Sequence, residues 1–136
     1  MDKDTEIMAR TLYGEARGEG LNGIEAVANV IINRVKYAHT TGPFWWGKTI
    51  KEVCLKPYQF SCWNPNDSNL AKITGDLSSD PVFEVCKRIA VRAIKGLLPD
   101  RTKGSTHYHT LSVNPGWATA LVPNVQIGNH LFYTCL

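Results

Sequence analysis

The sequence lacks long apolar runs and closely spaced cysteine pairs. Its longest apolar stretch, residues 26–32, is interrupted by Asn29 and is far shorter than the ~20 residues that span a bilayer. The cysteines, at positions 54, 62, 86 and 135, form no C-x-x-C pair, which argues against a zinc ribbon or a thioredoxin-like site. They are also too few for a disulfide scaffold. We expect them to be mostly reduced and buried, although one pair, such as Cys54 and Cys62, could oxidise after release.

The sequence has a modest share of charged residues and shows neither repeats nor linkers. Charged residues make up 20% of the 136 residues and hydrophobic residues 43%, which excludes a disordered tail, a collagen-like repeat and a coiled coil. No repeat or glycine/serine-rich linker divides the chain, so we expect one domain over residues 1–136. Residues 1–6 contain no apolar segment of the kind that a secretory signal needs, so we expect no signal peptide at this end.

Positive charge is concentrated in the second half of the sequence. The net charge is only +3, but the part from Val85 to the end has one acid, Asp100, against six basic residues: Lys87, Arg88, Arg92, Lys95, Arg101 and Lys103. Such asymmetry suits an anionic polymer, for example a cell envelope, while a solvated helix face is the alternative. No nucleic-acid-binding motif accompanies it, so we expect no nucleic-acid partner.

Four helices are predicted from apolar residues at helical spacing. The first covers about residues 4–16, and the second covers about residues 23–37 and is expected to be the central buried helix. Asn22 is the expected cap of the second helix, with Glu25 reaching back to it as in a capping box.

The two later helices carry clear start signals. Thr49 and Glu52 fit a capping box at the start of a short third helix. Asp80 and Pro81 mark the start of the fourth helix, which is expected to end at Gly96. Residues 104–136 contain short alternating runs broken by glycine and proline, which predicts a small β element. The predicted fold class is therefore α+β, mostly helical, with a small β element in the C-terminal third.

Glu15 is the first candidate for a catalytic residue. It lies in the segment YGEARGE, residues 13–19, at the last turn of the first predicted helix. Partial burial and the negative end of a helix both favour the protonated form of a carboxyl group, which can then donate a proton as in lysozyme-type glycosidases. From spacing alone, a surface glutamate paired with Arg17 is the alternative.

Five short segments, each present once, stand out along the sequence. They are YGEARGE at 13–19, ANVIINRV at 28–35, QFSCW at 59–63, GSTHYH at 104–109 and IGNHLFY at 127–133. Together they cover essentially the whole chain and resemble the SleB/CwlJ-type cell wall hydrolases, with Gly-Ser-Thr where that family usually has Gly-Ala-Thr.

The resemblance implies a lysozyme-like catalytic domain that cuts the glycan strands of peptidoglycan, in several members by lytic transglycosylation. It places the family's essential glutamate at Glu15. Because no signal peptide or peptidoglycan-binding module of the spore-associated members is visible, we expect a compact phage-type endolysin. Such a protein is made in the cytoplasm and acts on the host wall after release.

A glycan cleft needs aromatic rings together with amide and hydroxyl groups, because sugars have apolar faces rimmed by hydroxyl groups. Most of the chain's aromatic side chains are expected in the core. The expected substrate-binding residues are Glu19, Gln59, Phe60, Ser61, Thr106, Tyr108 and His109, and Asn64 and Asn129 are further polar candidates. We expect Tyr108 to lie next to Glu15, where its ring would exclude water from the carboxyl group.

The histidines offer an alternative chemistry. In a strand, His107 and His109 share one face and Tyr108 lies on the other. Together with His130 and Glu15 they could hold zinc, as in a peptidoglycan amidase or peptidase. No helical ligand pair such as H-E-x-x-H supports this, so we expect neither a metal nor another cofactor.

The leading hypothesis is a muramidase or lytic transglycosylase in which Glu15 protonates the oxygen between N-acetylmuramic acid and N-acetylglucosamine. Transglycosylation is favoured because it can proceed with one glutamate, and Glu19 is expected to orient Arg17 or the cleft. Asp67 and Asp76 stay open as second carboxylates. The alternatives are the zinc enzyme and a non-catalytic envelope-binding module. We expect a monomer that binds peptidoglycan glycan strands and does not insert into a membrane.

Overall fold

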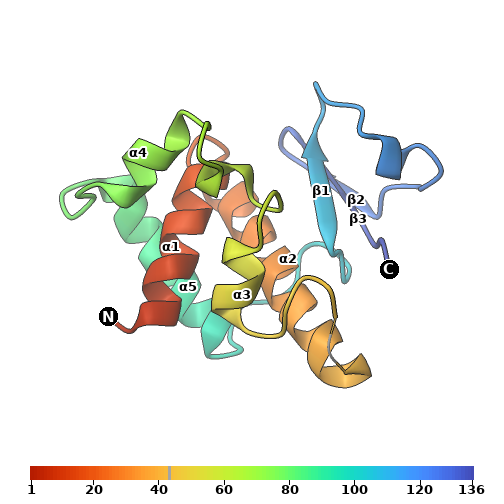
Figure 1. The fold of residues 1–136 in the computed structure, drawn as a ribbon, viewed down its shortest axis with the longest axis horizontal. Helices are drawn as coiled ribbons and strands as arrows, with labels where there is room; N and C mark the ends of the chain where they lie inside the picture. The colour runs from red at the N-terminus through yellow and green to blue at the C-terminus, as the bar shows by residue number, and fades with distance from the viewer. Residues whose placement is uncertain (43) are drawn as a thin grey trace.

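The structure, a computed structural model that describes residues 1–42 and 44–136, consists of a helical body with a small sheet beside it (Figure 1). The helices are α1 (Lys3–Ala16), α2 (Gly20–Thr41), α3 (Ile50–Leu55), α4 (Asn69–Thr74) and α5 (Pro81–Ile94), with 3-10 turns η1 (Ser61–Trp63) and η2 (Gly116–Ala118). The strands are β1 (His107–Thr110), β2 (Val125–Ile127) and β3 (His130–Tyr133). The predicted α+β class with a C-terminal β element is confirmed.

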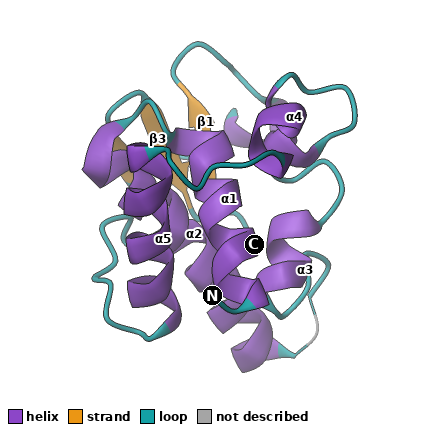
Figure 2. Cartoon of the chain, turned by 90° about the vertical axis from the view of Figure 1, so that its left-hand side faces the viewer, coloured by secondary structure: helices purple, strands orange, loops and turns teal. Residues whose placement is uncertain are grey.

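Three long helices enclose the core. The predicted apolar face of α1 is buried through Met8 and Leu12, and that of α2 through Val27 and Ile31. Ile89 of α5 is buried against the same cluster. Full burial of such side chains stabilises the fold by about 1.5–3 kcal/mol each. Figure 2 shows the helices gathered into one body, with the strands at one end.

The start of α2 differs from the prediction. The helix begins at Gly20, directly after Glu19, so Asn22 lies inside its first turn and caps nothing. Glu25 does not reach back to it, because its side chain is buried and accepts hydrogen bonds from Arg92 and Arg101. A buried carboxylate needs such partners more than a helix start needs a capping box.

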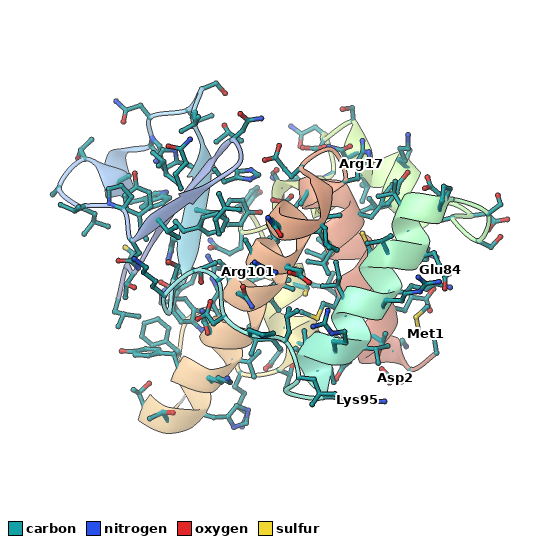
Figure 3. The ribbon with its side chains drawn as sticks, turned by 180° about the vertical axis from the view of Figure 1, so that it is seen from behind. Met1, Asp2, Arg17, Glu84, Lys95 and Arg101 are labelled. Carbon is teal, nitrogen blue, oxygen red and sulfur yellow. The ribbon has the colours of Figure 1, made fainter. Side chains whose placement is uncertain are left out.

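The predicted basic half of the chain is largely neutralised in the fold. Glu84 pairs with Lys87 at 2.8 Å and with Arg88 at 4.0 Å. Arg92 and Arg101 both form ion pairs with the buried Glu25. Glu25 lies before Val85 in the sequence, so the count from Val85 to the end did not include it. Lys95 and Arg101 are labelled in Figure 3, which views the molecule from the side opposite to that of Figure 1. The sequence count therefore overestimated the free positive charge, because it omitted acids that folding brings alongside.

The capping signals of the later helices are confirmed. The side chain of Thr49 accepts a hydrogen bond from the Glu52 amide at the start of α3, and Asp80 caps α5 through the amides of Val82 and Phe83. Helix α4 was not predicted. It has six residues, and Ile73 is its one buried side chain, so the apolar period is too short to be recognised.

The sheet has the strand order β1-β3-β2 and is antiparallel throughout. Tyr108 pairs with Phe132 and Thr110 with His130, so these four side chains share the face toward α2, where Phe132 packs on Ala26 and Val30. His107 and His109 point to the opposite face, as predicted. Over the described residues, no helix has the length and apolar character needed to cross a membrane.

Candidate active site

A cavity of about 740 Å³ lies between the helical body and the sheet. Its walls come from the last turn of α1, residues 58–61 and strand β1, with single side chains from α2, α4 and β3. Trp45, Val113, Trp117 and Cys135 complete the lining. Segments that lie far apart in the sequence therefore converge on Glu15.

Glu15 is the one acidic side chain among the described residues that line this cavity. Its Oε1 accepts a hydrogen bond from the Tyr108 hydroxyl, and its Oε2 accepts one from the Cys62 amide at 3.1 Å. Arg17 is turned away and donates to the Tyr13 carbonyl and to Asn69. The surface pair between Glu15 and Arg17 is thus absent, and the carboxyl group is held against the cavity wall.

The position of Glu15 depends on its neighbour Gly14. A Cβ atom at Gly14 would lie 2.6 Å from the Cβ of Cys62, so only glycine lets α1 approach η1 this closely. The approach brings the Cys62 amide to the carboxylate. Burial first, and then the Glu15 carboxylate, raise the pKa of the Cys62 thiol.

Tyr108 of β1 lies next to Glu15, as expected from the sequence. Burial, followed by the neighbouring Glu15 carboxylate, raises the pKa of the Tyr108 hydroxyl well above its ordinary value. The hydroxyl therefore stays protonated and can donate to the carboxylate. Its ring packs against Phe60 and Phe132, with centroid distances of 6.5 and 5.6 Å.

Arg34 is a functional candidate that the sequence analysis missed. Its guanidinium group lies between the rings of Trp46 and Phe60 and donates to the Thr106 carbonyl at 2.7 Å and to Gln59 at 3.3 Å. No acid pairs with it among the described residues, and burial lowers its pKa to about 10. Its position in the apolar stripe of α2, three residues after Ile31, was the available signal.

The exposed aromatic side chains of the described residues all line this cavity. They are Trp45, Tyr58 and Trp117, which are 49%, 81% and 37% exposed. Tyr58 also has a positive φ of 65°, a conformation that bulky residues seldom adopt outside functional sites. The substrate-binding prediction did not include these three residues, because sequence alone does not distinguish exposed aromatic rings from core ones.

The predicted substrate-binding residues divide into two groups. Gln59, Phe60, Ser61, Tyr108 and His109 line the cavity with Glu15, although Phe60 is almost fully buried.

Glu19 and Thr106 lie outside the lining. Glu19 accepts a hydrogen bond from the Asn129 amide and is 3.4 Å from His130, so it does not orient Arg17. Thr106 is buried, and its hydroxyl contacts His107 and Cys135.

The three candidate zinc ligands do not converge. His107 and His109 lie on one face of the sheet and His130 on the other. His109 is engaged by the Tyr133 hydroxyl at 2.8 Å, and His107 by Thr106. No group of three potential ligands that could hold a metal ion occurs in residues 1–42 and 44–136. This geometry contradicts the three-histidine zinc site of the alternative hypothesis.

The cysteines are free thiols in the structure. Cys54, Cys62 and Cys86 are buried and Cys135 is half-buried. Burial raises the pKa of Cys54 and of Cys86 to about 12, so neither thiol is reactive near neutral pH.

Comparison with known proteins identifies the family. The family described as "Cell Wall Hydrolase" matches residues 18–133. The chain belongs to this family. The matched range begins just after Glu15, but solved relatives extend the similarity over α1. The catalytic domain of the germination-specific lytic transglycosylase SleB from Bacillus anthracis is 28% identical, with a TM-score of 0.74 over 98% of this chain and 96% of that one.

Other members of the cell wall hydrolase family give the same result. The catalytic domain of the Bacillus cereus SleB protein is 29% identical, with a TM-score of 0.72 over 96% of this chain and 89% of that one. Spore cortex-lytic enzymes of Halalkalibacterium halodurans and Bacillus cereus are 31% and 32% identical over 96% and 95% of this chain. The chain spans only 34% and 43% of the lengths of those two curated relatives.

Proposed function

We propose that this domain cleaves the glycan strands of peptidoglycan at the bond between N-acetylmuramic acid and N-acetylglucosamine, with Glu15 as general acid. The observation that carries the proposal is the position of Glu15, the one acid of the described cavity lining, with its two oxygens held by Tyr108 and Cys62. A protonated Glu15 would give its proton to the glycosidic oxygen. The phenol and amide donors would then stabilise the carboxylate that remains.

The rim of the cavity supports a carbohydrate substrate. Trp45, Tyr58 and Trp117 offer exposed ring faces, and Gln59 and Ser61 offer amide and hydroxyl groups between them. Sugar rings pack on such faces while their hydroxyl groups hydrogen-bond to polar side chains. The solved relative from Bacillus anthracis is described as the catalytic domain of a lytic transglycosylase, which supports the same substrate class for this chain.

Transglycosylation fits this cavity better than a two-carboxylate mechanism. Glycosidases of the latter kind place a second carboxyl group about 5–9.5 Å from the acid. Asp67 and Asp76 do not line the cavity, and neither does Glu19. Attack by the 6-hydroxyl group of the muramyl unit itself would close a 1,6-anhydro ring without a second carboxylate. Lysis of a host bacterium by such a reaction remains a prediction.

The test is Glu15→Gln, which keeps the size of the side chain and removes the transferable proton. We expect at least ~100-fold slower release of products from purified peptidoglycan, since general acid catalysis contributes at least this much. Mass spectrometry of the wild-type digest should find 1,6-anhydro-muramyl ends. Glu6→Gln, in the same helix and away from the cavity, is the matched control and should keep normal activity.

A folded Glu15→Gln variant with near-normal turnover would refute the assignment. Reducing muramic ends in the wild-type digest would instead indicate hydrolysis, and free peptides would indicate an amidase or peptidase.

A further inference from the structure

Glu19 and His130 form a buried carboxylate–imidazole pair next to the proposed acid. Their side chains are 16% and 4% exposed, and His130 Nδ1 lies 3.4 Å from Glu19 Oε1. The same oxygen accepts a hydrogen bond from the Asn129 amide at 3.1 Å. This hydrogen bond fixes the turn before β3. Within residues 1–42 and 44–136, Nδ1 is the one buried side-chain nitrogen or oxygen without a hydrogen-bond partner. Such an atom is rare in a native fold and calls for an explanation, of which a catalytic role is one.

The other edge of the ring is open to the cavity. His130 is one of the lining residues, and its ring lies edge-on to Tyr108 at a centroid distance of 5.0 Å. Nε2 has no hydrogen-bond partner among the described residues, but unlike Nδ1 it is not fully buried. A substrate in the cavity can therefore reach Nε2 beside Tyr108, on the sheet face that points toward α2.

The surroundings favour a neutral ring. Burial lowers the pKa of His130, and the positive form of His109 on β1 acts in the same direction, whereas the carboxylates of Glu19 and Glu15 oppose the shift. With its hydrogen on Nδ1, 3.4 Å from Glu19 Oε1, a neutral ring presents the lone pair of Nε2 to the cavity. Long contacts between catalytic groups commonly tighten in the complex with substrate.

We propose that His130 is a second catalytic residue, with Glu19 as its positioning residue: Nε2 accepts the proton of the hydroxyl group that attacks the anomeric carbon. This inference rests on the proposed glycan cleavage. In this step Glu15 itself releases a proton to the glycosidic oxygen, so a separate group takes the proton of the attacking hydroxyl group. Glu19 cannot attack the sugar itself, because it does not line the cavity.

The reaction balances as follows. The bond between the anomeric carbon and the glycosidic oxygen breaks while the proton of Glu15 moves to that oxygen. The 6-hydroxyl oxygen of the muramyl unit bonds to the anomeric carbon while its proton moves to Nε2. The imidazolium, stabilised by Glu19, then gives its proton to solvent, and Glu15 regains one from solvent.

His130→Asn tests the role of Nε2. The asparagine amide keeps a donor near the position of Nδ1 for Glu19, but it places no acceptor at Nε2. We expect kcat on purified peptidoglycan to fall about 100-fold, with KM nearly unchanged, because general base catalysis is lost. His39→Asn, on the exposed end of α2, is the matched control and should leave kcat unchanged.

Glu19→Gln tests the positioning role through the pH profile. The Glu19 carboxylate raises the pKa of His130, so its removal should lower that pKa. The neutral ring then persists to lower pH, and the acidic limb of the kcat profile should move to lower pH. A purely structural contact would leave this limb in place.

The outcomes distinguish this inference from the proposed function. If wild-type protein releases anhydro ends and Glu15→Gln does not, but folded His130→Asn keeps its kcat, only the inference about His130 fails. If His130→Asn does not fold, nitrogen NMR of the wild-type imidazole decides instead. Hydrogen on Nδ1 is expected, and a ring with its hydrogen on Nε2 would overturn the proposal.

Discussion

A single hydroxyl group connects the sheet to the proposed acid. Tyr108→Phe removes the donor to Glu15 Oε1 and keeps the ring that packs on Phe60 and Phe132. A hydrogen bond to a charged group contributes about 1.5–3 kcal/mol, so we expect activity to fall about 10-fold or more, without unfolding. The measurement is the rate of product release from purified peptidoglycan.

Tyr133→Phe is the matched control for this change. It removes the hydroxyl that contacts His109 on the other face of the sheet and leaves the Tyr108–Glu15 contact intact. Equal losses in the two variants would show that the sheet as a whole matters, rather than the bond to Glu15.

Individual site residues were predictable where a short motif fixes them. Glu15 and Tyr108 were placed together correctly because each lies in a recognisable segment. Arg34 lies in such a segment too, but its role depends on Trp46, Phe60 and the Thr106 carbonyl, which only folding brings together. Glu19 was predicted to bind substrate because it lies close to Glu15 in the sequence. In the fold its side chain turns toward the Asn129 amide instead.

At the scale of elements, the buried Glu25 connects α2 to α5 and to the following loop. Arg92 Nη1 lies 3.3 Å and Arg101 Nε 2.6 Å from its oxygens. Replacing both arginines by Met would leave a buried carboxylate without an ion pair, which costs about 3–5 kcal/mol. We expect a matching fall in the free energy of unfolding, measured with urea and circular dichroism.

Arg88→Met provides the comparison for the double variant. Arg88 is also on α5, but its side chain is 75% exposed and 4.0 Å from Glu84. Its loss should change stability by no more than about 0.5 kcal/mol. A double variant as stable as Arg88→Met would show that the pairs with Glu25 contribute nothing net.

Helix starts were predictable only where the capping side chain faces solvent. Thr49 caps as expected, and Asp80 does so through Oδ1 while its Oδ2 accepts a hydrogen bond from the Tyr13 hydroxyl. Glu25 also fitted a capping pattern, but the pattern does not reveal that its side chain turns into the core. The start of α2 was therefore placed three residues too late, at Gly23 instead of Gly20.

At the scale of the whole molecule, the fold class followed from the sequence. The segments with helical periodicity form the helical body, and the short alternating runs of residues 104–136 form the sheet beside it. The charge distribution did not follow from the sequence, because Glu84 pairs with Lys87 and Arg88 within α5, and Glu25 of α2 pairs with Arg92 across the fold. Among the six basic residues counted in the sequence, Lys95 and Lys103 have no ion pair within the described chain. The contribution of this segment to attraction to an anionic envelope would therefore depend mainly on these two lysines.

Two histidines with lowered pKa make the stability of the whole domain sensitive to mild acid. Burial, and then the positive charge of Arg34, lower the pKa of His107 from 6.5 to about 4, and burial also lowers that of His130. Between these pH values the unfolded chain binds a proton that the folded chain excludes. The free energy of unfolding should therefore fall as the pH drops from about 6.5 toward 4. Asp80 and Asp100, whose pKa is lowered from 3.8, add their loss only below that range.

The variant His107→Gln isolates the largest of these contributions. The unfolded and folded states then bind equal numbers of protons at position 107, so the decline in stability between pH 6.5 and 4.5 should become shallower. Urea unfolding of the wild type and the variant at several pH values gives the slopes directly. His39→Gln removes an exposed histidine of α2 and should leave the wild-type slope unchanged. If His107→Gln kept the full slope, the acid sensitivity of the fold would have to come from groups other than the imidazole beside Arg34.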